Sequence, residues 1–247
     1  MARWALVTGA ASGIGRATAR RLVGAGWQVA AFDLHDQGMQ DLGAALTGAL
    51  DVRDPAAWSA AIDAVSRASG GALHLLVNNA GVGAGGWLED VPAERLRAVL
   101  DTNLLGPMLG VQAALPLLKQ TPGARVVFVG SMTGACGPPQ VAAYAASKAG
   151  VRALAESLSA ELSRFDVAVT HLMPGLVDTP LLDGGSFSGD AVDLRRGALL
   201  SPDAVAAEVL RERGPLHRPL GRDARGVVWL ARWWPGLLRW GMRREVG

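Results

Sequence analysis

The sequence predicts an α/β fold in which one doubly wound parallel sheet is covered by helices on both faces. Two observations predict it. Residues 73–77 and 126–129 are apolar runs of the kind found in strands that are buried on both faces of a parallel sheet. Such runs alternate with helical patterns, and no linker, charge run or repeat divides the 247 residues. We expect one domain over residues 1–220 and a basic, aromatic extension over residues 221–247 that is not an independent domain.

Six strands are expected in this sheet. They lie near residues 3–7, 27–33, 47–50, 73–78, 124–130 and 166–172. Helices are expected between them. Residues 142–161 are rich in Ala and Leu, which are good helix formers, and long helices are expected near residues 103–118 and 142–164.

The first strand runs directly into a glycine-rich turn and an amphipathic helix. Thr8 is followed by glycines at positions 9, 13 and 15. Glycines let the backbone approach a pyrophosphate, and the first N–H groups of the helix favour negative charge. Asp33 ends the second strand, close to the offset at which an acid binds the adenine ribose of a dinucleotide. The alternatives are an ordinary tight turn, which also uses glycine, and an Asp33 that only caps a turn or helix.

A second set of residues indicates proton transfer. Tyr144, the only tyrosine, stands four positions before Lys148, so that both side chains share one face of the expected helix. An adjacent cation would lower the pKa of the phenol. Ser131 follows an expected strand, and its hydroxyl could hold a substrate oxygen there. The alternative is a core tyrosine and a solvated lysine that share a helix by accident.

Together with four further segments, these residues resemble the short-chain dehydrogenase/reductase family. The segments are Asp51–Val52, residues 78–81, Asn103 and residues 174–179, and the resemblance runs from about Arg3 to about Pro180. It implies a Rossmann-type fold and an oxidoreductase that acts on a secondary alcohol or ketone. It also implies four roles. Tyr144 would be the general acid/base, Lys148 would lower its pKa and hold the nicotinamide ribose, Ser131 would orient the substrate, and Asn103 would anchor a water. Asn103 could also merely bridge backbone groups.

The resemblance further implies a set of cofactor-binding positions, with Thr179 at the nicotinamide carboxamide. NAD is favoured over NADP, because Asp33 would repel a 2′-phosphate and its neighbours Leu34 and Ser12 are not basic. Arg16 is a basic residue whose direction the sequence leaves open. The positions are Thr8, Gly9, Ser12, Gly13, Ile14, Gly15, Asp33, Leu34, Asp51, Val52, Asn79, Ala80, Gly81, Tyr144, Lys148, Pro174, Gly175, Val177 and Thr179.

The substrate is the least defined part of the prediction. Residues 176–200 are expected to form a mobile lid. Leu181, Leu182 and Phe187 would give the lid an apolar inner face, and Trp87 would add a further apolar wall. Such a lining favours a lipophilic, steroid-like or polycyclic alcohol or ketone. Arg195 and Arg196 could instead bind a carboxylate, and the apolar residues could simply be core or subunit contacts. An alternative function is a non-catalytic dinucleotide-binding regulator or scaffold that docks through the C-terminal extension.

Composition and charge point to a soluble protein of the cytoplasm. No room for a signal peptide precedes the first strand, no apolar run reaches about 18 residues, and the single cysteine, Cys136, suits a reducing compartment. Cys136 is interpreted as a small apolar filler rather than a nucleophile. The four histidines show no metal spacing, so no metal site is expected. A net charge of +2 and the lack of a dense basic run argue against nucleic acid as a partner.

The C-terminal extension is unusual for the family. Nine arginines and three acids lie from position 211 onward, and Pro235 should interrupt any single helix. Basic and aromatic groups recurring together could contact a membrane surface. We favour an extension wrapped over its own domain or a partner subunit, with its tryptophans buried. A homodimer is expected through the helices near 103–118 and 142–164; a tetramer is possible.

Overall fold

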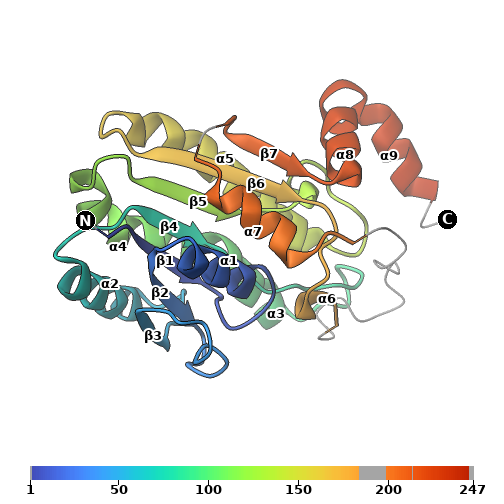
Figure 1. Ribbon diagram of the computed structural model, residues 1–247. Helices are drawn as coiled ribbons and strands as arrows, with labels where there is room; N and C mark the ends of the chain where they lie inside the picture. Colours follow the sequence, from blue (N-terminus) through green and yellow to red (C-terminus); the bar gives the residue numbers. More distant parts are fainter. Residues whose placement is uncertain (1, 184–198, 213, 245–247) are drawn as a thin grey trace.

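The computed structural model describes residues 2–183, 199–212 and 214–244. Their strands form one seven-stranded sheet in the order β3-β2-β1-β4-β5-β6-β7, in which every pairing is parallel (Figure 1). The predicted fold class is confirmed, and all six predicted strands are found. The strands are β1 Trp4–Thr8, β2 Gln28–Asp33, β3 Leu46–Ala49, β4 Leu75–Asn78, β5 Arg125–Val129, β6 Ala168–Pro174 and β7 His217–Leu220.

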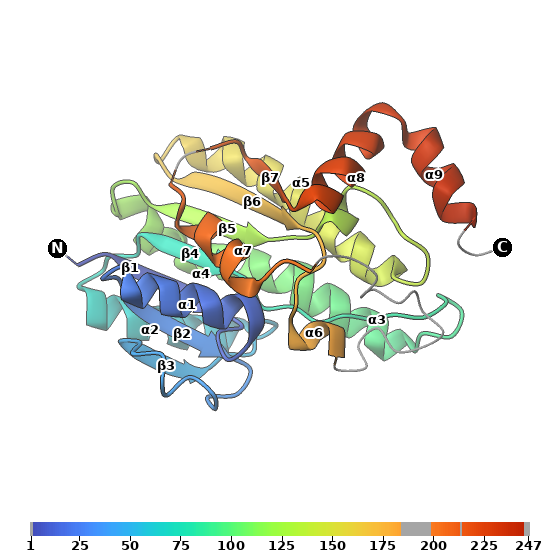
Figure 2. The ribbon, with the colours of Figure 1, turned by 45° about the vertical axis from the view of Figure 1, so that its right-hand side comes forward.

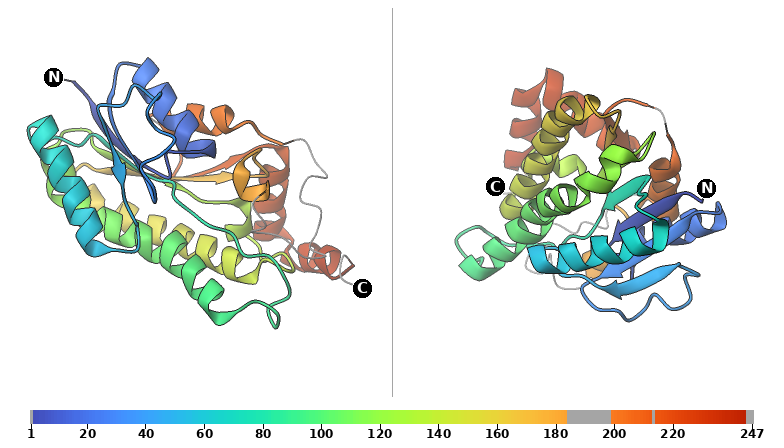
Figure 3. Two further views of the ribbon diagram at one scale, coloured as in Figure 1. Left: turned by 90° about the horizontal axis from the view of Figure 1, so that it is seen from below. Right: turned by 90° about the vertical axis from the view of Figure 1, so that its left-hand side faces the viewer.

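Helices cover both faces of the sheet. The helices α1 (Gly13–Gly24) and α7 (Pro202–Leu210) lie on one face, and α2 (Pro55–Ser69), α4 (Gly106–Gln120) and α5 (Ala142–Ser163) lie on the other (Figure 3). The helix α3 (Ala93–Leu100) leads into α4 through a π-helical turn, Asp101–Leu105. Short elements complete this part, a 3₁₀ turn at Met132–Gly134 and α6 at Pro180–Asp183.

The central strands are buried on both sides, as their apolar sequences predict. Leu6 and Leu76 pack into the core beneath α2, α4 and α5, while Val7 and Val77 pack into the core beneath α1 and α7. All four are fully buried. Since burying one such side chain stabilises the fold by about 1.5–3 kcal/mol, these two cores on opposite faces hold the helices against the sheet.

The strand order reverses between β1 and β4, and this reversal places the site. Parallel strands deliver their following loops to one edge of the sheet. The glycine turn after β1 and Asn79 after β4 therefore leave the sheet side by side. In open sheets of this class, ligands bind in the crevice at such a switch point.

The seventh strand, β7, was not predicted. It contains His217, Arg218 and Pro219, and no apolar run marks it in the sequence. It forms because it pairs with β6 at the edge of the sheet, where a proline is tolerated. Arg218 is buried and donates to the backbone carbonyls of Glu208 and Arg211, at the end of α7.

The extension folds into two helices, α8 (Arg222–Trp233) and α9 (Pro235–Arg244), which project from the sheet as a hairpin (Figure 2). Pro235 begins the second helix, so the predicted interruption is confirmed. The expectation that the domain buries the tryptophans of the extension is wrong. All four are exposed, because only the start of α8 packs against the sheet and its loops. No helix in the described ranges is long and apolar enough to cross a bilayer.

Candidate active site

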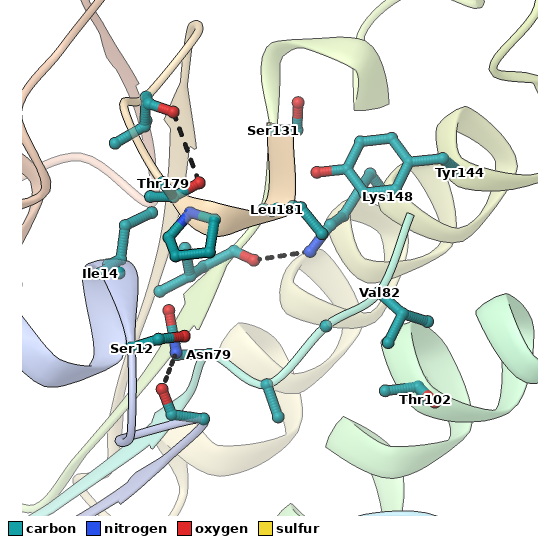
Figure 4. Close-up of a pocket in the computed structure, with 18 of the residues that line it drawn as sticks. Ser12, Ile14, Asn79, Val82, Thr102, Ser131, Tyr144, Lys148, Thr179 and Leu181 are labelled. Atoms are coloured by element: carbon teal, nitrogen blue, oxygen red, sulfur yellow. Dashed lines mark hydrogen bonds between the residues drawn. The ribbon is translucent and has the colours of Figure 1, made fainter. Parts of the chain in front are cut away.

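A cavity of about 430 Å³ lies at the carboxyl edge of the sheet, at the switch point. The loops after β1, β2, β4, β5 and β6 and the start of α5 all contribute to it (Figure 4). It brings together the predicted catalytic and cofactor-binding residues with three exceptions. Thr8, Gly15 and Asn103 do not line it, and each lies behind the wall and contacts residues that form it.

The glycine turn presents the start of α1 to this cavity. Gly9 and Gly13 have positive φ angles of 66° and 50°, which residues with a side chain rarely adopt. A Cβ on Gly15 would overlap the carbonyl of Gly9. Ser12, at the N-cap, makes no capping hydrogen bond with its side chain, and the first turn of α1 carries no acid. The first N–H groups of α1 are thus left to bind an anion from the cavity.

Thr8 and Asn79 fix this turn to the neighbouring strand. The Thr8 hydroxyl accepts hydrogen bonds from the N–H groups of Asn79 and Ala80, both at 3.1 Å. The Asn79 amide donates in return to the carbonyls of Thr8, at 2.9 Å, and Gly9, at 3.2 Å. These bonds hold the ends of β1 and β4 in one arrangement beneath the cavity.

Asp33 lies at the far end of the cavity with its carboxylate fixed. It accepts hydrogen bonds from the N–H groups of Ala11, at 2.9 Å, and Leu34, at 2.7 Å. Arg16, whose direction the sequence leaves open, turns to a different carboxylate. Its guanidinium donates to Asp41 at 2.7 Å and also contacts the carbonyl of Gly38. Arg16 is therefore engaged outside the cavity, and it does not line the wall.

Ser131, Tyr144 and Lys148 converge on the other end of the cavity (Figure 4). The Tyr144 hydroxyl is hydrogen-bonded to Ser131. The Lys148 ammonium lies 5.6 Å from the centre of the Tyr144 ring and donates to the carbonyl of Val129 at 3.0 Å. Thr133 donates to the Ser131 hydroxyl through both its own hydroxyl, at 3.0 Å, and its N–H, at 3.2 Å. Thr133 is a positioning residue that the sequence reasoning missed, although a Thr two positions after a Ser is a recognisable local turn pattern.

The protonation of this group differs from the prediction. Burial raises the pKa of Tyr144 to about 12, and the hydrogen bond with Ser131 offsets only part of this rise. Burial also lowers the pKa of Lys148 to about 8. The predicted lowering of the tyrosine pKa is therefore wrong for the protein alone, because loss of solvation outweighs the nearby cation. At neutral pH Tyr144 is a neutral phenol that is ready to donate a proton.

Asn103 is buried in the π-helical turn between α3 and α4. Its Oδ1 accepts from the N–H of Val82 at 2.8 Å, and its Nδ2 donates to the carbonyl of Val82 at 2.9 Å and to the hydroxyl of Ser147 at 3.1 Å. Asn103 thus bridges backbone groups, which the sequence analysis gave as the alternative to anchoring a water. The segment that it holds belongs to the cavity wall, and a Cβ built on Gly81 would lie 3.2 Å from Asn103 Oδ1 and 3.7 Å from Lys148 Nζ. π-helical turns occur frequently at functional sites.

The loop after β6 closes the cavity and is held from behind. Thr179 lies on the glycine turn, with its methyl group 3.1 Å from where a Cβ of Gly13 would stand. The N–H of Leu176 donates to the carboxylate of Asp223, at the start of α8, at 3.2 Å. The N–H of Gly175 donates to the carbonyl of Leu220 at 2.9 Å. The strand β7 and the helix α8, which sequence reasoning did not connect to the site, therefore support a wall of it.

Of the residues predicted to contact the substrate, only some line the cavity. Leu181 and Leu182 line the cavity, together with Val82 and Met132. Trp87 is 44% exposed and does not line the cavity, so the expectation that it forms a wall is wrong. Phe187, Arg195 and Arg196 lie outside the described residues. Arg53, which was not predicted, lines the cavity beside Asp51, and this arginine lowers the pKa of that carboxyl through paired hydrogen bonds.

The described residues give little support for a metal site or for a cysteine nucleophile. No group of three or more His, Cys, Asp or Glu side chains there is placed to hold a metal ion. Burial raises the pKa of Cys136, which disfavours the thiolate that a nucleophile needs.

This sheet, with an anion-binding turn at its switch point, defines the class of dinucleotide-binding α/β proteins. The comparison with known families is more specific. The family model described as short chain dehydrogenase matches residues 3–185, and the chain belongs to the short-chain dehydrogenase/reductase family. Its members are oxidoreductases that act on an alcohol or ketone with a nicotinamide dinucleotide.

Individual proteins agree with this assignment. A 3-alpha-(or 20-beta)-hydroxysteroid dehydrogenase from Mycobacterium bovis is 37% identical over 184 residues, which is 72% of this chain and 70% of the relative. The crystal structure of a short-chain dehydrogenase from Streptomyces avermitilis matches with a TM-score of 0.84 at 28% identity, over 99% of this chain and 98% of that one. A 3-ketoacyl-(acyl-carrier-protein) reductase from Brucella melitensis, complexed with NADH, matches with a TM-score of 0.78 at 29% identity, over 86% of this chain and 91% of that one.

Proposed function

We propose that this protein is an NAD(H)-dependent oxidoreductase that transfers a hydride between nicotinamide and a lipophilic secondary alcohol or ketone. One observation carries the proposal. The cavity has an anion-binding helix start and a fixed carboxylate at one end, and Ser131, Tyr144 and Lys148 at the other. A dinucleotide laid between these ends would bring its reactive ring beside the phenol.

The described residues fit such a cofactor. Its pyrophosphate would lie at the open start of α1, its adenine ribose at Asp33 and its nicotinamide near Thr179. When bound, the nicotinamide supplies the position that gives or takes the hydride. Its ribose would lie within reach of Lys148.

The side chains of the site would have separate roles in binding the substrate and moving the proton. Ser131 would hold the substrate oxygen, oriented for this by its two hydrogen bonds from Thr133. Tyr144, neutral at pH 7 because burial raises its pKa to about 12, would donate a proton to that oxygen during ketone reduction. Alcohol oxidation needs the phenolate instead, and Lys148 is the cation placed to stabilise it.

The choice of NAD over NADP rests on the charges around Asp33. Its carboxylate would face a 2′-phosphate with like charge, and the nearest candidate cation, Arg16, is paired with Asp41. The test is the ratio of kcat/KM for NADH and NADPH. We expect at least a tenfold preference for NADH in the unaltered protein and a smaller preference in Asp33→Ala. A preference for NADPH in the unaltered protein would contradict this reading of the site.

The proposed substrate class rests on the apolar end of the cavity. Val82, Met132, Leu181 and Leu182 line it. A relative named as a hydroxysteroid dehydrogenase, 37% identical, supports a bulky apolar alcohol. A panel of cyclic and steroid ketones and acyclic short-chain ketones, followed by NADH absorbance, tests this. Faster reduction of the small acyclic ketones would contradict the proposal.

Tyr144→Phe distinguishes an enzyme from a dinucleotide-binding regulator. The variant keeps the ring and loses the proton donor, so we expect NADH binding within threefold of the unaltered protein and a fall in kcat of at least about a hundredfold. Turnover that survives the substitution would remove Tyr144 from the mechanism. A protein that binds NADH but turns over no ketone or alcohol, whether or not Tyr144 is present, would favour the regulator.

A homodimer through α4 and α5 remains part of the proposal. Leu100, Leu105 and Met108 are exposed apolar side chains at the end of α3, in the π-helical turn and in α4, where a partner could cover them. Sedimentation equilibrium at micromolar concentration tests the expected dimer, and a monomer mass would contradict it.

A further inference from the structure

The C-terminal hairpin carries an exposed apolar surface, which we call the tail patch and define as Trp229, Trp233, Trp234, Leu237 and Trp240. These side chains are 55%, 62%, 58%, 53% and 53% exposed. The tryptophans at positions 4, 27 and 58 are instead at most 8% exposed. Leaving five large apolar side chains of one short segment in water is unfavourable, and such a patch commonly marks an interaction surface.

The hairpin is also strongly basic. Residues 222–244 contain six arginines and one acid, Asp223, which gives a net charge of +5. Asp223 is turned toward the N–H of Leu176 and not toward an arginine. None of the six arginines forms an ion pair with another residue of the described chain. Two stack on tryptophans of the patch instead, Arg232 at 5.3 Å from Trp233 and Arg244 at 3.9 Å from Trp240.

We propose that the tail patch and these arginines dock the protein on the surface of an anionic phospholipid bilayer. Tryptophan lies preferentially at the boundary between headgroups and acyl chains, and unpaired arginines bind the phosphates beside it. The helices α8 and α9, of 12 and 10 residues, are too short to cross a bilayer and lie on it. A second copy of this chain is a less suitable partner for the tail patch, because pairing the two hairpins would bring the six arginines of one copy against the six of the other.

The hairpin begins close to the cavity. The helix α8 follows the carboxyl end of β7, which is the edge of the sheet where the cavity lies (Figure 1). Its start contacts the 3₁₀ turn after Ser131, and Asp223 holds Leu176 in the cavity wall. The proposed docking surface is therefore connected directly to the edge of the sheet that carries the cavity. The docking itself does not depend on the proposed oxidoreductase activity.

The test is co-sedimentation of the full chain with large vesicles. We expect binding to vesicles of 30% phosphatidylglycerol in phosphatidylcholine, loss of binding at 0.5 M salt, and little binding to phosphatidylcholine alone. Arg232→Glu combined with Arg239→Glu should weaken binding at least about tenfold. The charge-matched control is Arg67→Glu with Arg164→Glu, two exposed arginines outside the hairpin, and it should bind within twofold of the unaltered protein.

A second pair of variants tests the apolar contact. Trp233→Ala with Trp240→Ala should weaken binding at least about tenfold, while Trp87→Ala, an exposed tryptophan outside the hairpin, should not. Both tail tryptophans are exposed, so these variants should keep the unfolding midpoint of the unaltered protein. The proposal is overturned if anionic vesicles sediment no protein at low salt, or if hairpin variants and controls bind equally. It is also overturned if the tryptophan variants only convert a larger assembly into a smaller one.

Discussion

Replacing Asn103 with Ala should reduce both the stability and the turnover of this protein, and its cost can be worked out from the structure. The side chain makes three hydrogen bonds, two to the backbone of Val82 and one to Ser147, at 2.8, 2.9 and 3.1 Å. Each such bond contributes about 0.5–1.5 kcal/mol net. Val82 is partly exposed, so water can replace some of what is lost. We expect the free energy of unfolding to fall by about 2–3 kcal/mol.

In a chain of this size, that loss corresponds to an unfolding midpoint lower by about 5–10 °C. Differential scanning fluorimetry measures this shift, and the protein should remain folded at 25 °C, where kcat is compared. We expect kcat to fall at least tenfold. The bonds to Val82 hold the cavity wall beside Lys148, and their loss lets the group around Tyr144 shift.

A matched control separates the two effects. Thr121 is also buried, accepts from the N–H of Leu73 at 3.0 Å and donates to the carbonyl of Leu117 at 2.7 Å, and it does not line the cavity. Thr121→Val should lower the unfolding midpoint by a similar amount and leave kcat unchanged. If Asn103→Ala also keeps kcat within twofold at 25 °C, Asn103 is a structural brace only, and the reasoning is refuted.

Two further predictions concern Lys148 and Asp223. Burial lowers the pKa of Lys148 from 10.5 to about 8, so the charged form destabilises the folded state below pH 8, and stability should rise between pH 8 and 10.5. The penalty at pH 7 is at most about 3.4 kcal/mol, which is 2.5 pKa units at 1.36 kcal/mol each. Lys148→Met should therefore raise the unfolding midpoint at pH 7 and lose at least about a hundredfold in kcat; a clearly lower midpoint would contradict this. Asp223→Ala removes the acceptor for the N–H of Leu176 and should raise the Kd for NADH about three- to tenfold in a fluorescence titration. Asp203→Ala, at the start of α7 and paired with Arg21, is its control, and equal Kd values for both variants would show that α8 does not support the cofactor site.

The local parts of the fold and the site were predictable from the sequence. Central strands such as β4 and β5 are apolar runs, and such a run can be recognised without its partners. The glycine turn at positions 9–15 is similarly local, because positive φ angles at Gly9 and Gly13 require the residue type itself. The spacing of Tyr144 and Lys148 also places both side chains on one face of α5.

Features that depend on distant neighbours were missed or wrongly predicted. The strand β7 has no apolar run and exists because β6 offers it an edge. The pKa of Tyr144 rises where the sequence predicted a fall, since the sequence shows the nearby cation but not the loss of solvation around the hydroxyl. The role of Asp223 follows from packing between residues 47 positions apart.

The sequence by itself determined which residues can carry the chemistry, because the glycine turn, the acid at the end of β2 and the phenol–amine pair are set by residue type and short spacing. Only the tertiary structure decided how those residues are solvated, what braces them and which surfaces stay uncovered. The tail tryptophans are an example, since an amphipathic, arginine-rich segment suits either a covered or an open position. Burial depends on which elements pack together across the whole chain, and no local pattern contains that information.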